Sequence, residues 1–264
     1  MERFCVIQPS AVLAPYVKHY WLLESDDVVN SQRVIPTGNI ELLFHRKCPM
    51  KCGDRIFPRT SLSGQSFSFA DLIPTGRVHM IAVVFHPFGA KAFFEMPLCE
   101  LSNQIVSADD LNIASLKDLE DKILNTVDDK VCIRLIESFL LNRLNPFKEY
   151  NYKRMAIAVN AINLSLEGLS VSELADTVAL SKKQFQRIFS EHVGATPKEF
   201  MRIVRFHRAL YTLQKNPSMN FTTLAHECGY YDQAHMTNEF KLFSGYTPSQ
   251  YVAICAPYSD YFSF

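Results

Sequence analysis

The sequence predicts an α+β N-terminal half that is strand-rich and barrel-like, followed by an all-α C-terminal half with two helix-turn-helix units. Short β-type runs separated by turn residues fill the first 90 residues, and helical periodicity replaces them from residue 116 onward. One helix-turn-helix pattern then occurs twice between residues 171 and 251. A length of 264 residues suits two domains, each large enough for its own core.

The N-terminal half begins with strands. Runs rich in β-branched and aromatic residues, bounded by turn signals, predict strands at Tyr20–Leu23, Ser31–Ile35, Ile40–His45 and Val78–Phe85. A turn at 36–39, with the sequence Pro-Thr-Gly-Asn, joins two of these strands, and Pro-Phe-Gly at 87–89 ends the last one. We therefore expect a strand-rich, barrel-like core.

Two helices are expected after a brief helical segment at 91–95. Apolar residues share one helix face at Leu116, Leu119, Ile123 and Leu124, and again at Val131, Leu135, Ile136, Phe139 and Leu140. Two interpretations remain open: these faces form a dimer surface, or they cover the barrel. Because Asn145-Pro146 stops the second helix, we expect a first domain at 1–145, a linker at 146–152, a second domain at 153–254 and an aromatic tail at 255–264.

The C-terminal half repeats itself. Leu174-Ala175 corresponds to Leu224-Ala225 at an offset of 50 residues. The later positions correspond at an offset of 51: Phe185, Phe189, Gly194, Thr196, Pro197 and Phe200 match Met236, Phe240, Gly245, Thr247, Pro248 and Tyr251. One residue has therefore been added in the turn of the second unit, where a turn tolerates it. Two related supersecondary units in tandem indicate a duplicated device.

Each unit has the pattern of two short helices packed at a steep angle. Ala175 and Ala225 are small enough to let the second helix approach the first. Ser181 and Asp232 mark the N-caps of the second helices. The inward positions of these helices are Phe185 and Phe189 in the first unit, and Met236, Phe240 and Phe243 in the second.

The opposite faces of these second helices are polar. They carry Lys183, Gln186, Arg187 and Ser190 in the first unit, and Ala234, Thr237, Asn238 and Lys241 in the second. Such a face suits reading of the DNA major groove. The other interpretation is a solvated face of an ordinary helical bundle, and the duplication in register argues against it.

A longer helix is expected between the units. Thr196-Pro-Lys-Glu199 combines an N-cap, a proline at the first helical position and a glutamate at the third, and Asn216-Pro217 ends the helix. Its apolar stripe comprises Phe200, Ile203, Val204, Ala209, Leu210 and Leu213. Such a helix would hold the units at a fixed separation, so that two recognition helices enter successive major-groove faces about 34 Å apart.

Residues 150–253 resemble the DNA-binding domain of the AraC/XylS family of bacterial transcription regulators. The resemblance rests on Leu174-Ala175, Ser181, Phe185, Arg187-Ile-Phe189, Gly194-Ala-Thr-Pro197, Arg205, Ala209, Leu224-Ala225, Gly229-Tyr230, Phe240-Lys241 and Gly245-Tyr-Thr-Pro248. It implies a seven-helix domain that binds double-stranded DNA. The residues implied in DNA binding are Ser181, Lys182, Lys183, Gln186 and Arg187, with Gln233, Ala234, Thr237, Asn238 and Lys241.

One departure from the family pattern concerns the second recognition helix. This chain has Asn238 where the family commonly has arginine. Because asparagine favours adenine edges and arginine favours guanine, we expect the second half-site to be read differently, or more weakly, than in a typical member.

The N-terminal half more loosely resembles the cupin-like effector or dimerisation domain of the same family, through residues 33–44 and 85–90. The resemblance implies a homodimer, a small-molecule effector, RNA polymerase as a partner and activation of transcription. The sequence does not identify the effector site. Residues that could line an apolar cavity, although plain core is the favoured interpretation of each, are Tyr16, Tyr20, Trp21, Phe44, Phe85 and Phe88. Arg33 and Glu41 either orient a polar ligand or face water.

Charge permits DNA binding without predicting it. Residues 150–253 contain 11 Lys and Arg against 8 Asp and Glu, a net charge of +3, whereas residues 1–149 contain 16 against 18, a net charge of −2. So small a positive charge favours moderate, salt-sensitive non-specific affinity, and discrimination is left to base contacts.

The sequence indicates a cytoplasmic protein without membrane contact. No apolar run approaches the ~20 residues of a membrane span, and the N-terminal Met-Glu-Arg-Phe-Cys is not a signal peptide. The seven cysteines are scattered, as in proteins with reduced thiols. Cys48 and Cys52 form one close pair without a second ligand pair, so two free thiols are favoured over a zinc site or a redox switch.

Catalysis is not expected. His19, His45, His79 and His86 include no H-x-H pair of the kind that cupin metal sites need, and neither a Gly-rich phosphate loop nor a G-x-S-x-G elbow occurs. We therefore predict no metal, no cofactor and no enzyme activity. The main hypothesis is a DNA-binding regulator controlled through its N-terminal domain. The alternative is a constitutive DNA-binding regulator whose N-terminal domain only binds a protein partner. A third hypothesis, an enzyme fused to a DNA-binding domain, would need a bound metal.

Overall fold

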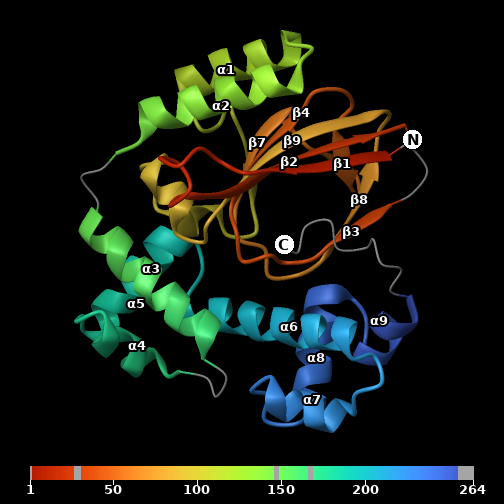
Figure 1. Cartoon of the computed structure of the whole chain (residues 1–264), viewed down its shortest axis with the longest axis vertical. Coiled ribbons are helices and arrows are strands. Elements are labelled where there is room, and N and C mark those ends of the chain that lie inside the picture. Colours follow the sequence, from red (N-terminus) through yellow and green to blue (C-terminus); the bar gives the residue numbers. More distant parts are fainter. Residues whose placement is uncertain (1, 27–30, 146–148, 166–168, 255–264) are drawn as a thin grey trace.

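The computed structural model describes residues 2–26, 31–145, 149–165 and 169–254 (Figure 1). Its N-terminal part contains two sheets, and every described strand pair is antiparallel. The larger sheet has the strand order β1 (Glu2–Ile7), β2 (Val17–Ser25), β9 (Val78–Phe85), β4 (Glu41–His45), β7 (Thr60–Ser63) and β10 (Ile105–Ser107). The smaller sheet has the order β3 (Gln32–Val34), β8 (Ala70–Pro74), β5 (Met50–Cys52) and β6 (Arg55–Ile56).

The larger sheet buries both of its faces. Because side chains alternate along a strand, Tyr20 and Leu22 join one apolar cluster while Trp21 and Leu23 join another, which includes Met50 of the smaller sheet. The described strands do not close into a barrel, which corrects the expectation of a cupin-like barrel. The second apolar face of the larger sheet is covered by a separate sheet, so the sheet does not need to curl onto itself.

Helices cover the other face of the larger sheet. The helices α1 (Ala114–Asn125) and α2 (Asp129–Arg143) pair with each other over it (Figure 1), and two 3-10 turns, η1 (Gly89–Ala92) and η2 (Leu98–Leu101), pack into the same core. The buried residues of the two helices include Leu116, Leu119, Ile123, Ile136, Phe139 and Leu140. Of the two interpretations of these apolar faces, the packing therefore supports the one in which they cover the sheet.

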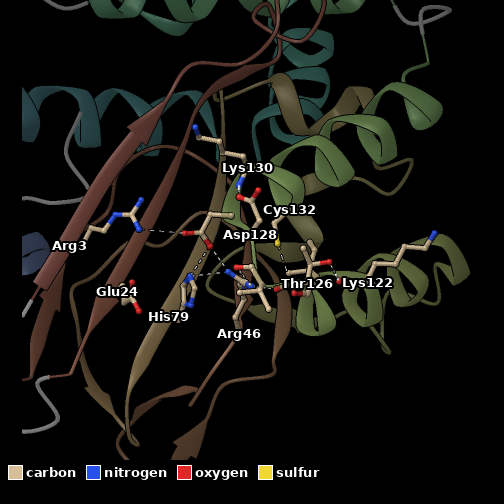
Figure 2. A network of polar contacts seen from close by, with 12 residues as sticks. Arg3, Glu24, Arg46, His79, Lys122, Thr126, Asp128, Lys130 and Cys132 are labelled. Atoms are coloured by element: carbon tan, nitrogen blue, oxygen red, sulfur yellow. Dashed lines mark hydrogen bonds and ion pairs between the residues drawn. The ribbon is translucent and has the colours of Figure 1, made fainter.

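A polar network ties the turn between α1 and α2 to the larger sheet (Figure 2). Asp129, the first residue of α2, accepts a hydrogen bond from Arg46, which follows β4, and its carboxylate lies 2.9 Å from Nε2 of His79 on β9. Arg46 also donates to the backbone carbonyl of Thr126. The helix dipole favours a carboxylate at the start of a helix. The contacts of Asp129 with Arg46 and His79 therefore hold the N-terminus of α2 against the larger sheet.

The C-terminal part is helical. Its elements are α3 (Glu149–Leu164), α4 (Val171–Thr177), α5 (Lys182–Val193), α6 (Pro197–Lys215), α7 (Phe221–Glu227), α8 (Gln233–Ser244) and α9 (Pro248–Ile254). Residues 149–152, expected in the linker, belong to α3, whereas 146–148 and the expected tail at 255–264 lie outside the described residues. The long helix α6 contributes Phe200 to one apolar cluster and Phe206 to a second, so it joins two cores.

Candidate nucleic-acid interface

The first helix-turn-helix unit consists of α4, α5 and the turn between them. Both helices begin with a reciprocal capping box, Ser170 with Glu173 and Ser181 with Gln184, which confirms the predicted N-cap at Ser181. Leu174 and Ala175 of α4 are buried in the same cluster as Phe185 and Phe189 of α5. The inward face predicted for α5 is therefore correct, and it leaves the opposite face outside.

The outer face of α5 presents the side chains predicted for DNA. They are exposed without exception: Ser181, Lys182, Lys183, Gln186 and Arg187. Nη1 of Arg187 lies 3.0 Å from Oε1 of Glu191, one turn further along the helix. An exposed ion pair of this kind contributes about 0–1 kcal/mol, so the guanidinium can exchange its partner for a base at little cost.

The second unit consists of α7, α8 and their turn. Asn220 caps α7, and Oδ1 of Asp232 accepts a hydrogen bond from the backbone N–H of His235 at 2.7 Å, which confirms the second predicted N-cap. Met236, Phe240 and Phe243 are buried as expected. The candidate DNA-binding residues Gln233, Ala234, Asn238 and Lys241 are exposed, whereas Thr237 is half-buried.

Internal hydrogen bonds restrict part of the outer face of α8. The Thr237 hydroxyl donates to the backbone carbonyl of Gln233 at 2.8 Å, and the side-chain oxygen of Gln233 accepts from Thr222 of α7 at 3.0 Å. Ala234 offers only a methyl group. Asn238 is therefore the residue of this face best suited to a bidentate contact with a base edge.

The duplication extends beyond the two helices of each unit to the helix that precedes them, which sequence analysis missed. Buried residues of α3 match buried residues of α6 at an offset of 51: Met155, Ala158, Val159 and Ile162 with Phe206, Ala209, Leu210 and Leu213. Each repeat is thus a three-helix module. The signal was available in the sequence, as Arg154-x3-Ala158 and Arg205-x3-Ala209.

An arginine of this preceding helix holds the turn in each module. Arg154 donates to the carbonyl of Ala179 at 3.3 Å, and Arg205 donates to the carbonyl of Gly229 at the same distance. Both turn residues have left-handed backbone, with φ of 52° and 78°. The equivalent bonds place the helix-turn-helix turn at the same position in both modules.

The N-terminal part contacts the end of the first recognition helix. The buried amide of Gln65 donates to the carbonyls of Gly38 at 2.8 Å and Val193 at 3.1 Å, and the hydroxyl of Ser102 donates to the carbonyl of Gly194 at 2.7 Å. Since Val193 ends α5 and Gly194 is its C-cap, these bonds satisfy carbonyls that a helix end leaves without intrahelical partners.

The N-terminal part also contacts the end of the second recognition helix, at the matching position. Arg33 donates to the carbonyl of Ser244, the last residue of α8, at 3.3 Å. Its guanidinium lies between the rings of Phe69 and Tyr246, at 4.2 and 4.5 Å from their centroids. Two further bonds of 2.7 Å to Asp71 fix its plane, and they hold the pKa of that carboxyl below its usual value.

A third contact joins the N-terminal part to α6. Nε2 of His207 lies 2.6 Å from the carbonyl oxygen of Pro36. In the same predicted turn, Gly38 has a φ of 74°, and a Cβ there would lie 3.2 Å from the ring of Phe200. The turn therefore sits against α6 at a distance that favours glycine.

The residues considered for an effector cavity do not gather at one place. Tyr20, Phe44 and Phe85 belong to the cluster under the helices, and Tyr16 packs against that cluster. Trp21 belongs to the cluster between the sheets, and Phe88 to the first cluster of the C-terminal part. Of the two residues considered for a polar ligand, Arg33 contacts the end of α8 through the carbonyl of Ser244. Burial raises the pKa of Glu41 to about 7, against the opposing effect of Lys18.

Two further features concern metal binding and the membrane, within the described ranges. There, no group of three or more His, Cys, Asp or Glu residues could hold a metal ion, and Cys48 and Cys52 are free and half-buried. None of the helices in those ranges combines the length and apolar character that a bilayer span requires.

Comparisons with known proteins find matches for both parts of the chain. A sequence family described as a helix-turn-helix domain matches residues 174–253, and one described as a domain of unknown function matches residues 6–107. An uncharacterized HTH-type transcriptional regulator of Haemophilus influenzae is 35% identical over 81 residues, which are 31% of this chain and 27% of that protein. The HTH-type transcriptional activator RhaS of Pectobacterium carotovorum is 31% identical over 75 residues, 28% of this chain and 26% of that protein.

Through residues 174–253 the chain shares the helix-turn-helix domain of HTH-type transcriptional regulators. The alignment spans about a quarter of the length of these curated relatives. Among solved structures, a regulator with an AraC-type DNA-binding domain from Chromobacterium violaceum is 22% identical, covers 42% of this chain and all of its own, and has a TM-score of 0.36. ToxT from Vibrio cholerae is 10% identical, covers 85% of this chain and 97% of its own, and has a TM-score of 0.46.

Proposed function

We propose that this chain is a sequence-specific DNA-binding regulator of transcription, an activator, in which α5 and α8 enter the major groove. The observation that carries the proposal is the presence of two equivalent recognition helices, each with its apolar face buried and its polar face outside. The residues assigned to base edges are Lys183, Gln186, Arg187, Gln233, Ala234, Thr237 and Asn238. Ser181, Lys182 and Lys241 lie beside them and are assigned to the phosphate backbone.

The proposal includes control of DNA binding by a domain of residues 1–145, joined to the DNA-binding domain of residues 153–254. Its support is the pair of contacts at Val193 and Ser244, because each of them joins the N-terminal part to the end of one recognition helix. An effector that binds two arrangements of the domains unequally would shift the population able to bind DNA. A homodimer and an interaction with RNA polymerase belong to the same proposal.

A second candidate function keeps the DNA-binding part and removes the effector. In it, the N-terminal domain is a platform for a protein partner, and the contacts at the ends of α5 and α8 hold one constitutive arrangement. Ligand-induced thermal shift of the purified chain supports the first candidate, whereas a protein captured from a lysate in the absence of any thermal shift supports the second.

Selection of bound sequences from a random duplex library tests the DNA-binding proposal directly. Purified full-length chain is used, and selection is repeated at higher salt, which weakens phosphate contacts more than base contacts. A recovered site with two patches roughly one helical turn apart is expected if both units read sequence. A single patch would limit reading to the first unit. Absence of enrichment at every salt concentration, with and without cell extract as a source of effector, would contradict the proposal.

A further inference from the structure

A buried carboxylate holds the second recognition helix. Glu239 of α8 has a side chain only 6% exposed, and both of its oxygens are paired. Oε1 lies 2.6 Å from Nε of Arg202, and Oε2 lies 2.9 Å from Nη2 of Arg205. Both arginines belong to α6, so the three side chains connect the recognition helix to the long helix.

The arginines extend this connection beyond the ion pairs. Arg205 also donates to the carbonyl of Gly229 in the turn, and its guanidinium lies 4.5 Å from the ring centroid of Tyr230. Arg202 lies over the ring of Phe243, at 5.4 Å. Glu239 is thus the point at which α6, the turn and α8 are joined.

In the first module, an uncharged residue occupies the position of Glu239. At the offset of 51, Glu239 corresponds to Ile188, Arg202 to Asn151 and Arg205 to Arg154. Ile188 is 7% exposed and belongs to the apolar cluster of the first module. Both recognition helices bury an apolar face, but at this one position α5 makes apolar contact whereas α8 makes charge-assisted hydrogen bonds.

The position of Glu239 excludes a direct role in reading. It faces α6 from the buried side of α8, whereas Asn238 and Lys241 are exposed on the outer side. A buried ion pair is directional, and removal of one partner leaves an uncompensated charge in the interface. A change at Glu239 is therefore transmitted to the rotation and tilt of α8.

We infer that Glu239 is the positioning residue of the second recognition helix, so that base discrimination by the second unit depends on its charge and discrimination by the first unit does not. The inference rests on the proposed function, which it deepens: sequence specificity in the second half-site is set by the carboxylate that orients Asn238 as well as by Asn238 itself.

The test compares single-base discrimination in the two patches of the selected duplex. Wild type, Glu239→Gln and Asn238→Ala are titrated against duplexes carrying one base-pair change in either patch. Glu239→Gln is expected to reduce discrimination in the second patch about tenfold and to leave the first patch within about twofold of wild type. A merely structural role predicts something else: affinity falls for both patches with the unfolded fraction, and base preferences stay unchanged.

Two milder variants protect the test against loss of folding. Arg202→Gln removes one partner of Glu239 from a side chain that is 40% exposed, and Arg202→Lys keeps its charge. Thermal melting establishes that each variant is folded. Arg202→Gln is expected to reduce second-patch discrimination about threefold, and Arg202→Lys is expected to restore most of it.

The outcomes separate the inference from the proposed function. If wild type selects no DNA sequence, the proposed function fails. If wild type selects two patches and folded Glu239→Gln or Arg202→Gln retains full preference in the second patch, the inference alone is overturned. A wild-type site with only the first patch also overturns it, because the second helix then reads nothing.

Discussion

Gly194 and Gly245 end the two recognition helices in nearly the same left-handed conformation, with φ of 81° and 76°, and the N-terminal part of the chain lies against both. A Cβ on Gly245 would lie 2.5 Å from Nη1 of Arg33, and one on Gly194 would lie 3.1 Å from the carbonyl oxygen of Leu98. Glycine is thus favoured twice at each position, by its backbone angle and by the close neighbour. The duplicated helix ends have become the places where the two parts of the chain meet.

Replacement of Arg33 by alanine should loosen this meeting point. The change removes a hydrogen bond to α8 and a cation held between two rings, and we expect a loss of about 1–2 kcal/mol in the free energy of unfolding. Arg77→Ala is the matched control, because Arg77 pairs with Glu24 and Asp26 at the surface of the N-terminal part. If the contact governs DNA binding, affinity for the selected duplex changes in Arg33→Ala and stays constant in Arg77→Ala. If the two variants have equal unfolding free energies and equal affinities for the duplex, the Arg33 contact contributes neither to stability nor to DNA binding.

The turns of the two units predict opposite effects for one pair of substitutions. Ala179 has a φ of 52°, which costs a residue with a Cβ about 1–2 kcal/mol, whereas Gly229 adopts its φ of 78° freely. After allowance for the greater freedom of glycine in the unfolded chain, Ala179→Gly should stabilise by about 0.5–1 kcal/mol. Gly229→Ala should destabilise by about 1 kcal/mol. Urea unfolding measures both, and a loss of stability in Ala179→Gly would contradict the argument.

Base discrimination should differ between the recognition helices. Arg187→Ala is expected to relax preference in the first patch by about 1–3 kcal/mol, since arginine forms a bidentate contact with guanine. Asn238→Ala should cost less in the second patch. Titration against duplexes with single base changes gives both values, and an equal or larger loss for Asn238→Ala would mean that the second helix reads more strongly than its composition indicates.

Stability should fall on acidification because of buried neutral histidines. Burial lowers the pKa of His45 from 6.5 to about 4, and it lowers that of His19 similarly. Between pH 6.5 and 4 the unfolded chain therefore binds protons that the folded chain does not, and each histidine costs about 2 kcal/mol of stability by pH 5. Glu41 acts in the opposite direction, because its folded pKa of about 7 makes it a destabilising group above pH 4.5.

A substitution isolates the contribution of His45. His45→Leu should remove one part of the acid loss and leave stability at pH 7 little changed, since both ring nitrogens of His45 lie buried without a hydrogen-bond partner among the described residues. His226→Leu, on the exposed side of α7, is the control that keeps the acid loss. The unfolding free energy of each variant is measured at pH 7 and pH 5. The loss between the two pH values should be smaller in His45→Leu than in His226→Leu.

The parts of the fold that were predictable are those specified by local sequence. The four predicted strands are found as β2, β3, β4 and β9, and both N-caps and the connecting helix are confirmed, because periodicity and capping act within a few residues. Strand β7 was missed because its sequence, Thr-Ser-Leu-Ser, contains three hydroxyl residues, and only pairing with β4 and β10 makes it a central strand.

Long-range relationships were not predictable in the same way. Arg33 was considered for a polar ligand or for water, but its guanidinium meets Ser244, 211 residues later. The arrangement of the described strands as two sheets, and not as a barrel, likewise depends on which sheet covers Trp21, and no local pattern specifies that. For the candidate site, the sequence was sufficient to place the exposed faces of α5 and α8, while the buried network around Glu239 required the packing of α6 against α8.

The anchoring of both recognition helices at their C-terminal ends has a consequence for the DNA. The 19 residues of α6 span about 28 Å along the helix axis. The N-terminal part contacts the C-terminal ends of α5 and α8. Under the proposed function, the separation and the relative rotation of α5 and α8 are then both fixed. An insertion of about five base pairs between the two patches would turn the second patch to the opposite side of the duplex, where α8 cannot follow. Under the proposed function, the length of the spacer is therefore recognised along with the bases.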